Sequence, residues 1–159
     1  MTYLNPDIRN FPYSATVTDH AFVPLLAVSE LPREKLAIAW PLVQAARRDL
    51  DLAGWQADCE GLAERGGGVL GVEAEGGVLY GVATYEPRRK SRTGRVLQVD
   101  TLLSFEFSGR APVRNALCNA LFDCARRLDC DALSVAMPNR GFVEHAAAAA
   151  GRRRRARGD

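Results

Sequence analysis

Apolar positions fall into two kinds of spacing along the chain, and together these predict a mixed α/β domain. Short runs of β-branched and other apolar residues are typical of strands, and they occupy 21–29, 69–74, 78–86, 96–104 and 132–137. Apolar residues that recur every three or four positions are typical of amphipathic helices, and they occupy 33–50, 52–65, 113–128 and 142–150. The expected order is β-α-α-β-β-β-α-β-α.

Proline and glycine mark the boundaries of these elements. Pro41 should kink the first helix or divide it in two. The glycines at 66–68 follow a helix and precede a strand, so we interpret them as a helix end and a turn rather than a phosphate-binding loop. The segment 75–77 predicts a hairpin. We divide the chain into an irregular arm at 1–20, one domain at 21–151 and an arginine-rich tail at 152–159.

Composition supports an ordinary globular protein. The chain has 159 residues, of which 47% are hydrophobic, and a formal net charge of +2. Leaving out the tail, with its five arginines and one aspartate, leaves a net charge of −2. A nucleic-acid partner is therefore not expected. No apolar run approaches the ~20 residues of a membrane span, and the first residues lack a signal-peptide pattern, so we expect a cytoplasmic protein without a membrane partner.

The four cysteines do not predict a metal centre. They stand at 59, 118, 124 and 130, without a Cys-x-x-Cys pair, and the two histidines lie far from them in sequence. This spacing matches neither a zinc site nor a secreted disulfide framework. We expect buried, reduced thiols that pack as small apolar side chains.

The most informative stretch is the strand 96–104, the turn 107–112 and the helix 113–128. Pro112 suits a first helical position, where its missing N–H removes no hydrogen bond. A helix that begins soon after a strand presents unpaired N–H groups and a partial positive charge to an anion. Arg110 and Arg114 add charge beside this end. The residues alone therefore indicate a phosphate site.

This stretch and the order of elements around it resemble the Gcn5-related N-acetyltransferase family. In that family the central strand leads into a loop of pattern Gln/Arg-x-x-Gly-x-Gly/Ala, whose amides hold the pyrophosphate of acetyl-coenzyme A. The matching loop here departs from the pattern at Ser108, Ala111 and Val113, and Pro112 lacks an amide donor. The resemblance covers residues 21–151 and implies a mixed, mostly antiparallel central sheet flanked by helices.

The resemblance also implies a set of site residues. Contacts to acetyl-coenzyme A would come from the main chain of the central strand, from the loop and from one residue after the last strand, namely Leu102, Leu103, Ser104, Phe105, Ser108, Gly109, Arg110, Ala111, Val113, Arg114 and Asn139. Asp100, in the central strand, is the first candidate for the base and Glu106 the second. His145 stands in for the tyrosine acid that the family usually carries. Each of these also has an ordinary structural interpretation, as surface, capping or turn residues.

These observations predict an N-acyltransferase that moves an acetyl group from coenzyme A to a small amine or a protein amino group. The altered loop, the missing tyrosine and the short end of the chain favour an alternative, a non-catalytic binding or regulatory module with the same fold. A third hypothesis is an interaction protein that uses the tail and a basic hairpin loop at 88–95. Without a strand after the last helix, 132–137 would be an exposed apolar edge, so we also expect a homodimer.

Overall fold

The structure is a computed structural model that describes residues 25–90, 92, 94–137 and 141–146. Its centre is a six-stranded sheet in the order β1-β2-β3-β4-β5-β6, in which only β4 and β5 run parallel. The strands are β1 (Ala27–Glu30), β2 (Gly68–Glu73), β3 (Leu79–Lys90), β4 (Gly94–Ser104), β5 (Ala132–Met137) and β6 (Gly141–Ala146). The helices are the 3-10 turn η1 (Arg33–Lys35), α1 (Leu36–Ala46), α2 (Leu52–Glu64) and α3 (Pro112–Arg127).

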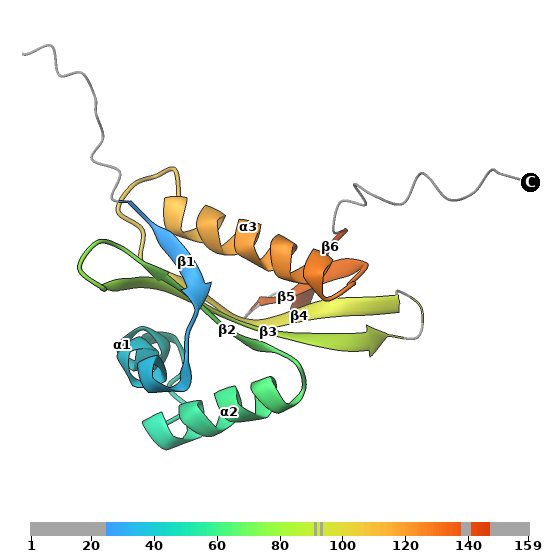
Figure 1. Ribbon diagram of the computed structural model, residues 1–159, viewed down its shortest axis with the longest axis horizontal. Helices are drawn as coiled ribbons and strands as arrows, with labels where there is room; N and C mark the ends of the chain where they lie inside the picture. The colour runs from blue at the N-terminus through green and yellow to red at the C-terminus, as the bar shows by residue number, and fades with distance from the viewer. Residues whose placement is uncertain (1–24, 91, 93, 138–140, 147–159) are drawn as a thin grey trace, which may run out of the picture.

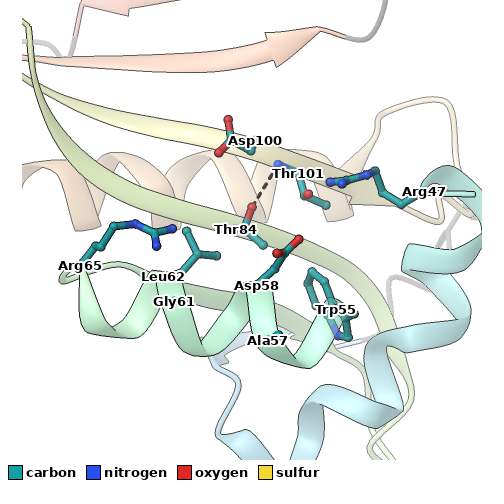
Figure 2. A pocket seen from close by; sticks show the side chains of 10 residues that line it. All are labelled: Arg47, Trp55, Ala57, Asp58, Gly61, Leu62, Arg65, Thr84, Asp100 and Thr101. Carbon is teal, nitrogen blue, oxygen red and sulfur yellow. Dashed lines mark hydrogen bonds between the residues drawn. The ribbon is translucent and has the colours of Figure 1, made fainter. Parts of the chain in front are cut away.

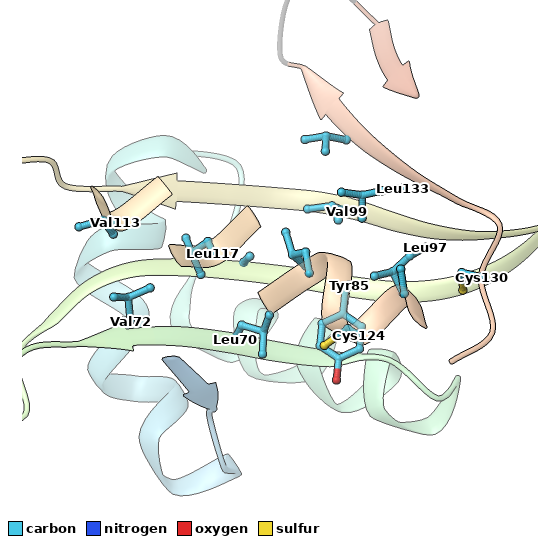
Figure 3. Close-up of a cluster of buried hydrophobic side chains, with 14 residues drawn as sticks. Leu70, Val72, Tyr85, Leu97, Val99, Val113, Leu117, Cys124, Cys130 and Leu133 are labelled. Carbon is cyan, nitrogen blue, oxygen red and sulfur yellow. The ribbon is translucent and has the colours of Figure 1, made fainter. Parts of the chain in front are cut away.

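The helices cover the two faces of this sheet, α1 and α2 on one and α3 on the other (Figure 1). The α3 face buries one apolar cluster, in which Leu97, Leu117 and Leu133 are almost or completely buried (Figure 3). The opposite face buries a second cluster, built around Val43, Trp55 and Val82. Each fully buried side chain of this size contributes about 1.5–3 kcal/mol. The sheet is therefore fixed from both sides.

The predicted fold class, a mixed and mostly antiparallel sheet flanked by helices, is confirmed. Helix 52–65 is found as α2, where the Asp51 carboxylate accepts a hydrogen bond from the Gly54 amide at 2.7 Å and caps the helix. The helix ends where predicted, because Gly66 adopts a φ of +79°. Pro41 lies inside the single helix α1, which stops at Ala46, four residues before the predicted end.

The last predicted element is wrong. Residues 141–146 form the strand β6 rather than the start of a helix over 142–150, and they pair antiparallel with β5. The alanine-rich sequence favours a helix locally, but the open edge of β5 offers a row of main-chain hydrogen bonds that a strand can use. Because β6 covers that edge, residues 132–137 are not the exposed apolar edge from which a homodimer was predicted. The homodimer stays a prediction.

The basic loop at 88–95 is also shorter than predicted. β3 runs to Lys90 and β4 starts at Gly94, so most of the basic residues belong to a long hairpin, with Arg88 paired to Val96 and Arg89 to Arg95. Gly94 adopts a φ of +75° at the start of β4. The predicted arm at 1–20 and the arginine-rich tail lie outside the described residues.

Candidate functional site: a polar cavity beside the central strand

The central strand β4 carries a bulge at its midpoint. Thr84 of β3 pairs with Thr101, whereas Glu86 pairs with Gln98, so three steps along β4 oppose two along β3. The Thr84 hydroxyl closes the gap by accepting a hydrogen bond from the Thr101 amide at 3.1 Å. In a regular strand, consecutive side chains point to opposite faces. The bulge instead brings Asp100 and Thr101 into the same cavity.

This cavity lies between α2 and the strands β3 and β4 (Figure 2) and has a volume of about 420 Å³. Its walls combine an aromatic ring, two hydroxyls, two arginines and two carboxylates with small apolar side chains. The lining residues are Arg47, Trp55, Ala57, Asp58, Gly61, Leu62, Arg65, Thr84, Asp100 and Thr101. A polar, partly enclosed space of this size suits a small charged ligand.

Both arginines of the cavity are already paired with carboxylates. The Arg47 guanidinium donates two hydrogen bonds to Asp49, at 3.0 and 2.9 Å, and these bonds raise the pKa of Arg47. Arg65 donates to Glu86 at 3.0 Å. Asp49 therefore balances the charge of Arg47. Arg65, in contrast, shares the single charge of Glu86 with Arg88.

The two carboxylates of the cavity accept no hydrogen bond from an arginine of the described residues, although both lie close enough to Arg47 to raise its pKa. Asp58 points from α2 toward the strands (Figure 2), and within the described part of the chain it has no hydrogen bond or ion pair. Asp100 accepts only an uncharged hydrogen bond, from Gln98 Nε2 at 3.2 Å. Thr101 is 6% exposed, and its side chain lines the same cavity. The cavity therefore favours a cationic group, such as an ammonium, next to a carboxylate that can take its proton.

The second feature of the site is a gap between the parallel strands. β4 and β5 are paired from Val96 and Ala132 to Val99 and Val135, and no further, although β4 continues to Ser104. The Phe105 amide still donates to the Tyr80 carbonyl of β3 at 2.7 Å. Main-chain groups alternate along a strand, so those of Leu102 and Ser104 point the other way, toward the gap. An extended ligand in the gap can form hydrogen bonds with these main-chain groups, as a neighbouring strand would.

The third feature is the beginning of α3, where the sequence predicts an anion site. The Glu106 carboxylate accepts hydrogen bonds from the Val113 amide at 3.2 Å and from the Arg114 amide at 2.7 Å. Pro112 has no N–H to offer. Glu106, a candidate base, is thus placed as the cap of α3 rather than in the cavity, on the opposite side of the sheet from Asp58.

The other predicted loop residues are spread around this helix end. Ser108, Gly109 and Arg110 are exposed, and Ala111 is half-buried with a φ of +49°. The Arg114 side chain is exposed, and no ion pair joins it or Arg110 to another described residue. Val113 is fully buried, and a Cβ added to Gly81 of β3 would lie 2.6 Å from its Cγ1. Its side chain therefore packs into the sheet.

The structure does not place the predicted site residues Asn139 and His145 beside the cavity. Asn139 belongs to 138–140, which the structure does not describe. His145 lies in β6, where its backbone pairs with Leu133, which in turn pairs with Leu97. Two strand spacings and three residues separate its backbone from Asp100, about 14 Å. The helix that was expected to carry His145 is not formed.

The cysteines behave as expected for buried thiols. All four are free, and burial raises the pKa of each, that of Cys59 to about 12. Among the described residues no group of three or more His, Cys, Asp or Glu side chains could hold a metal ion, and no helix is long and apolar enough to span a membrane.

Asp100 is the one predicted catalytic residue that lines this cavity, and the sequence does not single out the other lining residues. Arg47, Asp58 and Arg65 come from two helices that bear no recognisable motif, and Thr84 from a neighbouring strand. Asp58 lies on α2 at a position where polar residues are ordinary, so nothing in the sequence distinguishes it. For the bulge itself the sequence offers only the two predicted strands 78–86 and 96–104, which are rich in small and β-branched residues. That pattern predicts regular pairing rather than a bulge.

Solved structures with the same architecture are acetyltransferases. An aminoglycoside N-acetyltransferase in complex with CoA superposes with a TM-score of 0.64 at 14% identity, covering 74% of this chain and 80% of that one. An acetyltransferase of Trypanosoma brucei gives 0.60 at 16% identity, with 72% and 84% covered. The glucosamine-6-phosphate N-acetyltransferase of Arabidopsis thaliana gives 0.58 at 12% identity, with 70% and 81% covered.

These similarities establish that the chain has the fold of the Gcn5-related N-acetyltransferases. No protein-family model matches the sequence, and no curated protein matches it. The likeness is therefore one of fold, and the activity has to be argued from the site.

Coenzyme A fits this site in one part and not in the other. The gap beside β4 offers the main-chain groups of Leu102 and Ser104 to an extended pantetheine arm. The diphosphate does not fit at α3, because Glu106 occupies the amides of Val113 and Arg114 and Pro112 provides none.

Proposed function

We propose that this protein transfers an acyl group from a coenzyme A thioester to an amine held in the cavity beside β4. The observation that carries the proposal is the position of the bulge. It stands where β4 stops pairing with β5 and it places Asp100 in the cavity. An acceptor on one side of β4 and a thioester in the gap on the other would meet at this point of the strand.

The acceptor amine would bind as an ammonium between Asp58 and Asp100. Such an ammonium must lose a proton before its nitrogen can attack a carbonyl carbon. Asp100 lies next to the gap between β4 and β5, and among the described residues no arginine donates a hydrogen bond to it, so we assign it the role of proton acceptor. Asp58, on the opposite wall, would orient the amine. The Thr101 hydroxyl would accept a hydrogen bond from one of the remaining N–H groups of the amine.

The thioester supplies an activated acyl carbonyl. The chain's contribution on that side would be positional: the Leu102 and Ser104 main-chain groups hold the arm, and an amide directed at the carbonyl oxygen stabilises the negative charge that develops there. Tyr85 is not available as an acid, because its side chain is buried in the α3 core, where its hydroxyl donates to Glu30. We assign protonation of the leaving thiolate to solvent in the open gap and do not assign it to His145.

A donor and acceptor screen tests this proposal. We expect acetyl transfer from acetyl-coenzyme A to at least one member of a panel of primary amines, amino acids and peptide N-termini, detected by the mass of the acetylated product. Asp100→Asn should lower kcat by about 100-fold or more, as expected for loss of a proton acceptor, with a smaller effect on the KM of the donor. Asp58→Asn should raise the KM of the amine.

Glu75→Gln, in the exposed turn of the β2–β3 hairpin, is the matched control for removing a carboxylate charge, and it should leave the rate unchanged. Absence of product with every amine at millimolar acetyl-coenzyme A, or full activity of Asp100→Asn, would exclude the proposed reaction.

A second candidate function is a non-catalytic module that binds a small cationic ligand. The observation that favours it is the Glu106 carboxylate on the α3 amides, which removes the usual place for a diphosphate. Calorimetry separates the two functions. A module would bind an amine in a manner that depends on Asp58 and Asp100, but it would neither bind nor consume a thioester.

A further inference from the structure

Every main-chain donor of the first turn of α3 is either satisfied or missing. Glu106 Oε2 accepts from Val113 and Oε1 accepts from Arg114, at 3.2 and 2.7 Å. Pro112 has no N–H, and the next amide, that of Asn115, donates to the Ala111 carbonyl at 3.0 Å. A carboxylate that spans two adjacent amides at a helix N-terminus occupies the position that an anion would otherwise take.

The loop that carries Glu106 is anchored on both of its sides. Before it, the Phe105 amide donates to the Tyr80 carbonyl at 2.7 Å. After it, the Phe107 ring packs edge-on against the Tyr80 ring, with ring centroids 6.0 Å apart. Glu106 is therefore held between two contacts to one residue of β3. The arrangement is a built part of the fold rather than the chance position of a surface side chain.

The far end of the loop is fixed in the same way. The Ala111 amide donates to the Ser108 carbonyl at 3.2 Å, and Asn115 Nδ2 donates to the Arg110 carbonyl at 3.0 Å. Ala111 itself adopts a left-handed conformation, with a φ of +49°. A diphosphate that approached the helix would have to displace Glu106 and would meet its negative charge.

We propose that Glu106 is the resident anion of α3 and that the acyl donor is consequently recognised through its pantetheine thioester and not through its nucleotide. This inference rests on the proposed acyl transfer and names the donor class, acyl-pantetheine thioesters with or without an attached nucleotide. The reaction is the same for each donor. The amine nitrogen forms a bond to the acyl carbon, the carbon–sulfur bond breaks, and the proton lost by the amine is balanced by the one that the thiolate takes up.

The first test compares acetyl-coenzyme A with S-acetyl-pantetheine as donors to one amine. We expect kcat/KM values within about threefold of each other for the natural sequence. Glu106→Ala frees the amides of Val113 and Arg114, so it should raise kcat/KM for acetyl-coenzyme A by tenfold or more and leave that for S-acetyl-pantetheine unchanged. Glu75→Ala is the matched control and should change neither value.

The second test needs no acyl transfer and measures binding of inorganic pyrophosphate by calorimetry. The natural sequence should show none, whereas Glu106→Ala should bind it. Glu106→Gln keeps the shape and one acceptor of the cap without its charge, and it provides the same comparison if the alanine variant does not fold. This separates the inference from the proposed function. If no thioester is consumed, the proposed acyl transfer is excluded. If pyrophosphate is nevertheless bound by the Glu106 variants and not by the natural sequence, the assignment of Glu106 as the resident anion still holds.

Two outcomes would overturn the inference. One is pyrophosphate binding that is equal in the natural sequence and in Glu106→Ala, whether both bind it or neither does. The other is a preference of more than tenfold for acetyl-coenzyme A that Arg110→Ala with Arg114→Ala abolishes. That result would show the exposed arginine side chains, rather than the helix amides, to be the nucleotide contact.

Discussion

Glu86 places a negative charge in the sheet next to the cavity, with its side chain only 5% exposed. It accepts hydrogen bonds from Arg65 at 3.0 Å and from Arg88 at 2.8 Å. Replacing it with glutamine keeps the shape but removes the charge that both arginines use. We expect Glu86→Gln to lower the free energy of unfolding at pH 7 by about 1–3 kcal/mol, measured by urea denaturation.

The same residue predicts a pH dependence. Burial by itself would raise the pKa of the Glu86 carboxyl, but the hydrogen bonds from Arg65 and Arg88 outweigh this and hold the pKa below its ordinary value. Because the pKa of Glu86 is lower in the folded state than in the unfolded state, its charged form stabilises the folded protein at pH values above the unfolded pKa of about 4.3. This stabilisation is lost as the pH falls through the pKa of the folded state. The difference in stability between the natural sequence and Glu86→Gln should therefore shrink below about pH 4. A difference that is constant from pH 7 to pH 3, with Glu75→Gln as the reference, would contradict this.

The sequence predicts the role of some individual residues and not of others. Asp100 is singled out because it stands in the middle of the central strand, where the resembled family often carries an acidic residue. Glu106 could not be recognised as a helix cap, because it stands seven residues before Val113 and reaches the helix only after the loop folds back onto Tyr80. Such a contact depends on tertiary structure, whereas the usual capping signals lie within three or four residues of the helix start.

Among the elements, the bulge of β4 depends on one hydroxyl. Thr84 is 3% exposed, and its side-chain oxygen accepts a hydrogen bond from the Thr101 amide at the bulge. Thr84→Val removes this hydrogen bond and should lower the free energy of unfolding by about 0.5–1.5 kcal/mol. Hydrogen exchange at the Thr101 amide should become faster. Thr84→Ser keeps the acceptor and is the control, so equal losses in both variants would rule out the hydrogen bond as the cause.

The contact of α3 with β3 gives a second prediction for the elements. Gly81 lets the helix approach, because a Cβ there would lie 2.6 Å from Val113 Cγ1 and 3.0 Å from Leu117 Cδ1. Gly81→Ala should destabilise the protein by about 1–3 kcal/mol through overpacking. In a double-mutant cycle, Val113→Ala should relieve part of that loss, since it removes the nearer methyl group. Strictly additive effects would show that the two sites do not interact.

The elements also show where local pattern fails. Helix 113–128 and strand 132–137 were predicted almost to the residue, since their apolar periodicity and their pairing agree. Residues 142–146 were predicted as a helix from their alanine-rich surroundings, but they form β6 because the edge of β5 provides hydrogen-bond partners that no local pattern reveals. The hairpin of β3 and β4 is longer than its charge pattern suggests for the same reason.

For the whole molecule, the four thiols report how tightly the two faces of the sheet are closed. Cys59 belongs to the cluster under α1 and α2, and Cys124 and Cys130 to the cluster under α3. Cys118 is half-buried on α3. Burial raises the pKa of all four, so at pH 8 little thiolate exists in the folded state, about a thousandfold less for Cys59 than for an unfolded cysteine.

We therefore expect a thiol reagent at pH 8 to label all four cysteines rapidly in urea but only slowly in the folded protein, with Cys118 first. Cys118→Ser should remove that first phase and leave the rest unchanged. The remaining labelling must wait for opening of the core, because thiolates are the reacting species and these are excluded from solvent. Its rate should thus rise in the destabilised Gly81→Ala protein in proportion to the loss of stability. If Cys59 and Cys124 instead react at the unfolded rate without denaturant, the sheet is not closed by helices on both faces.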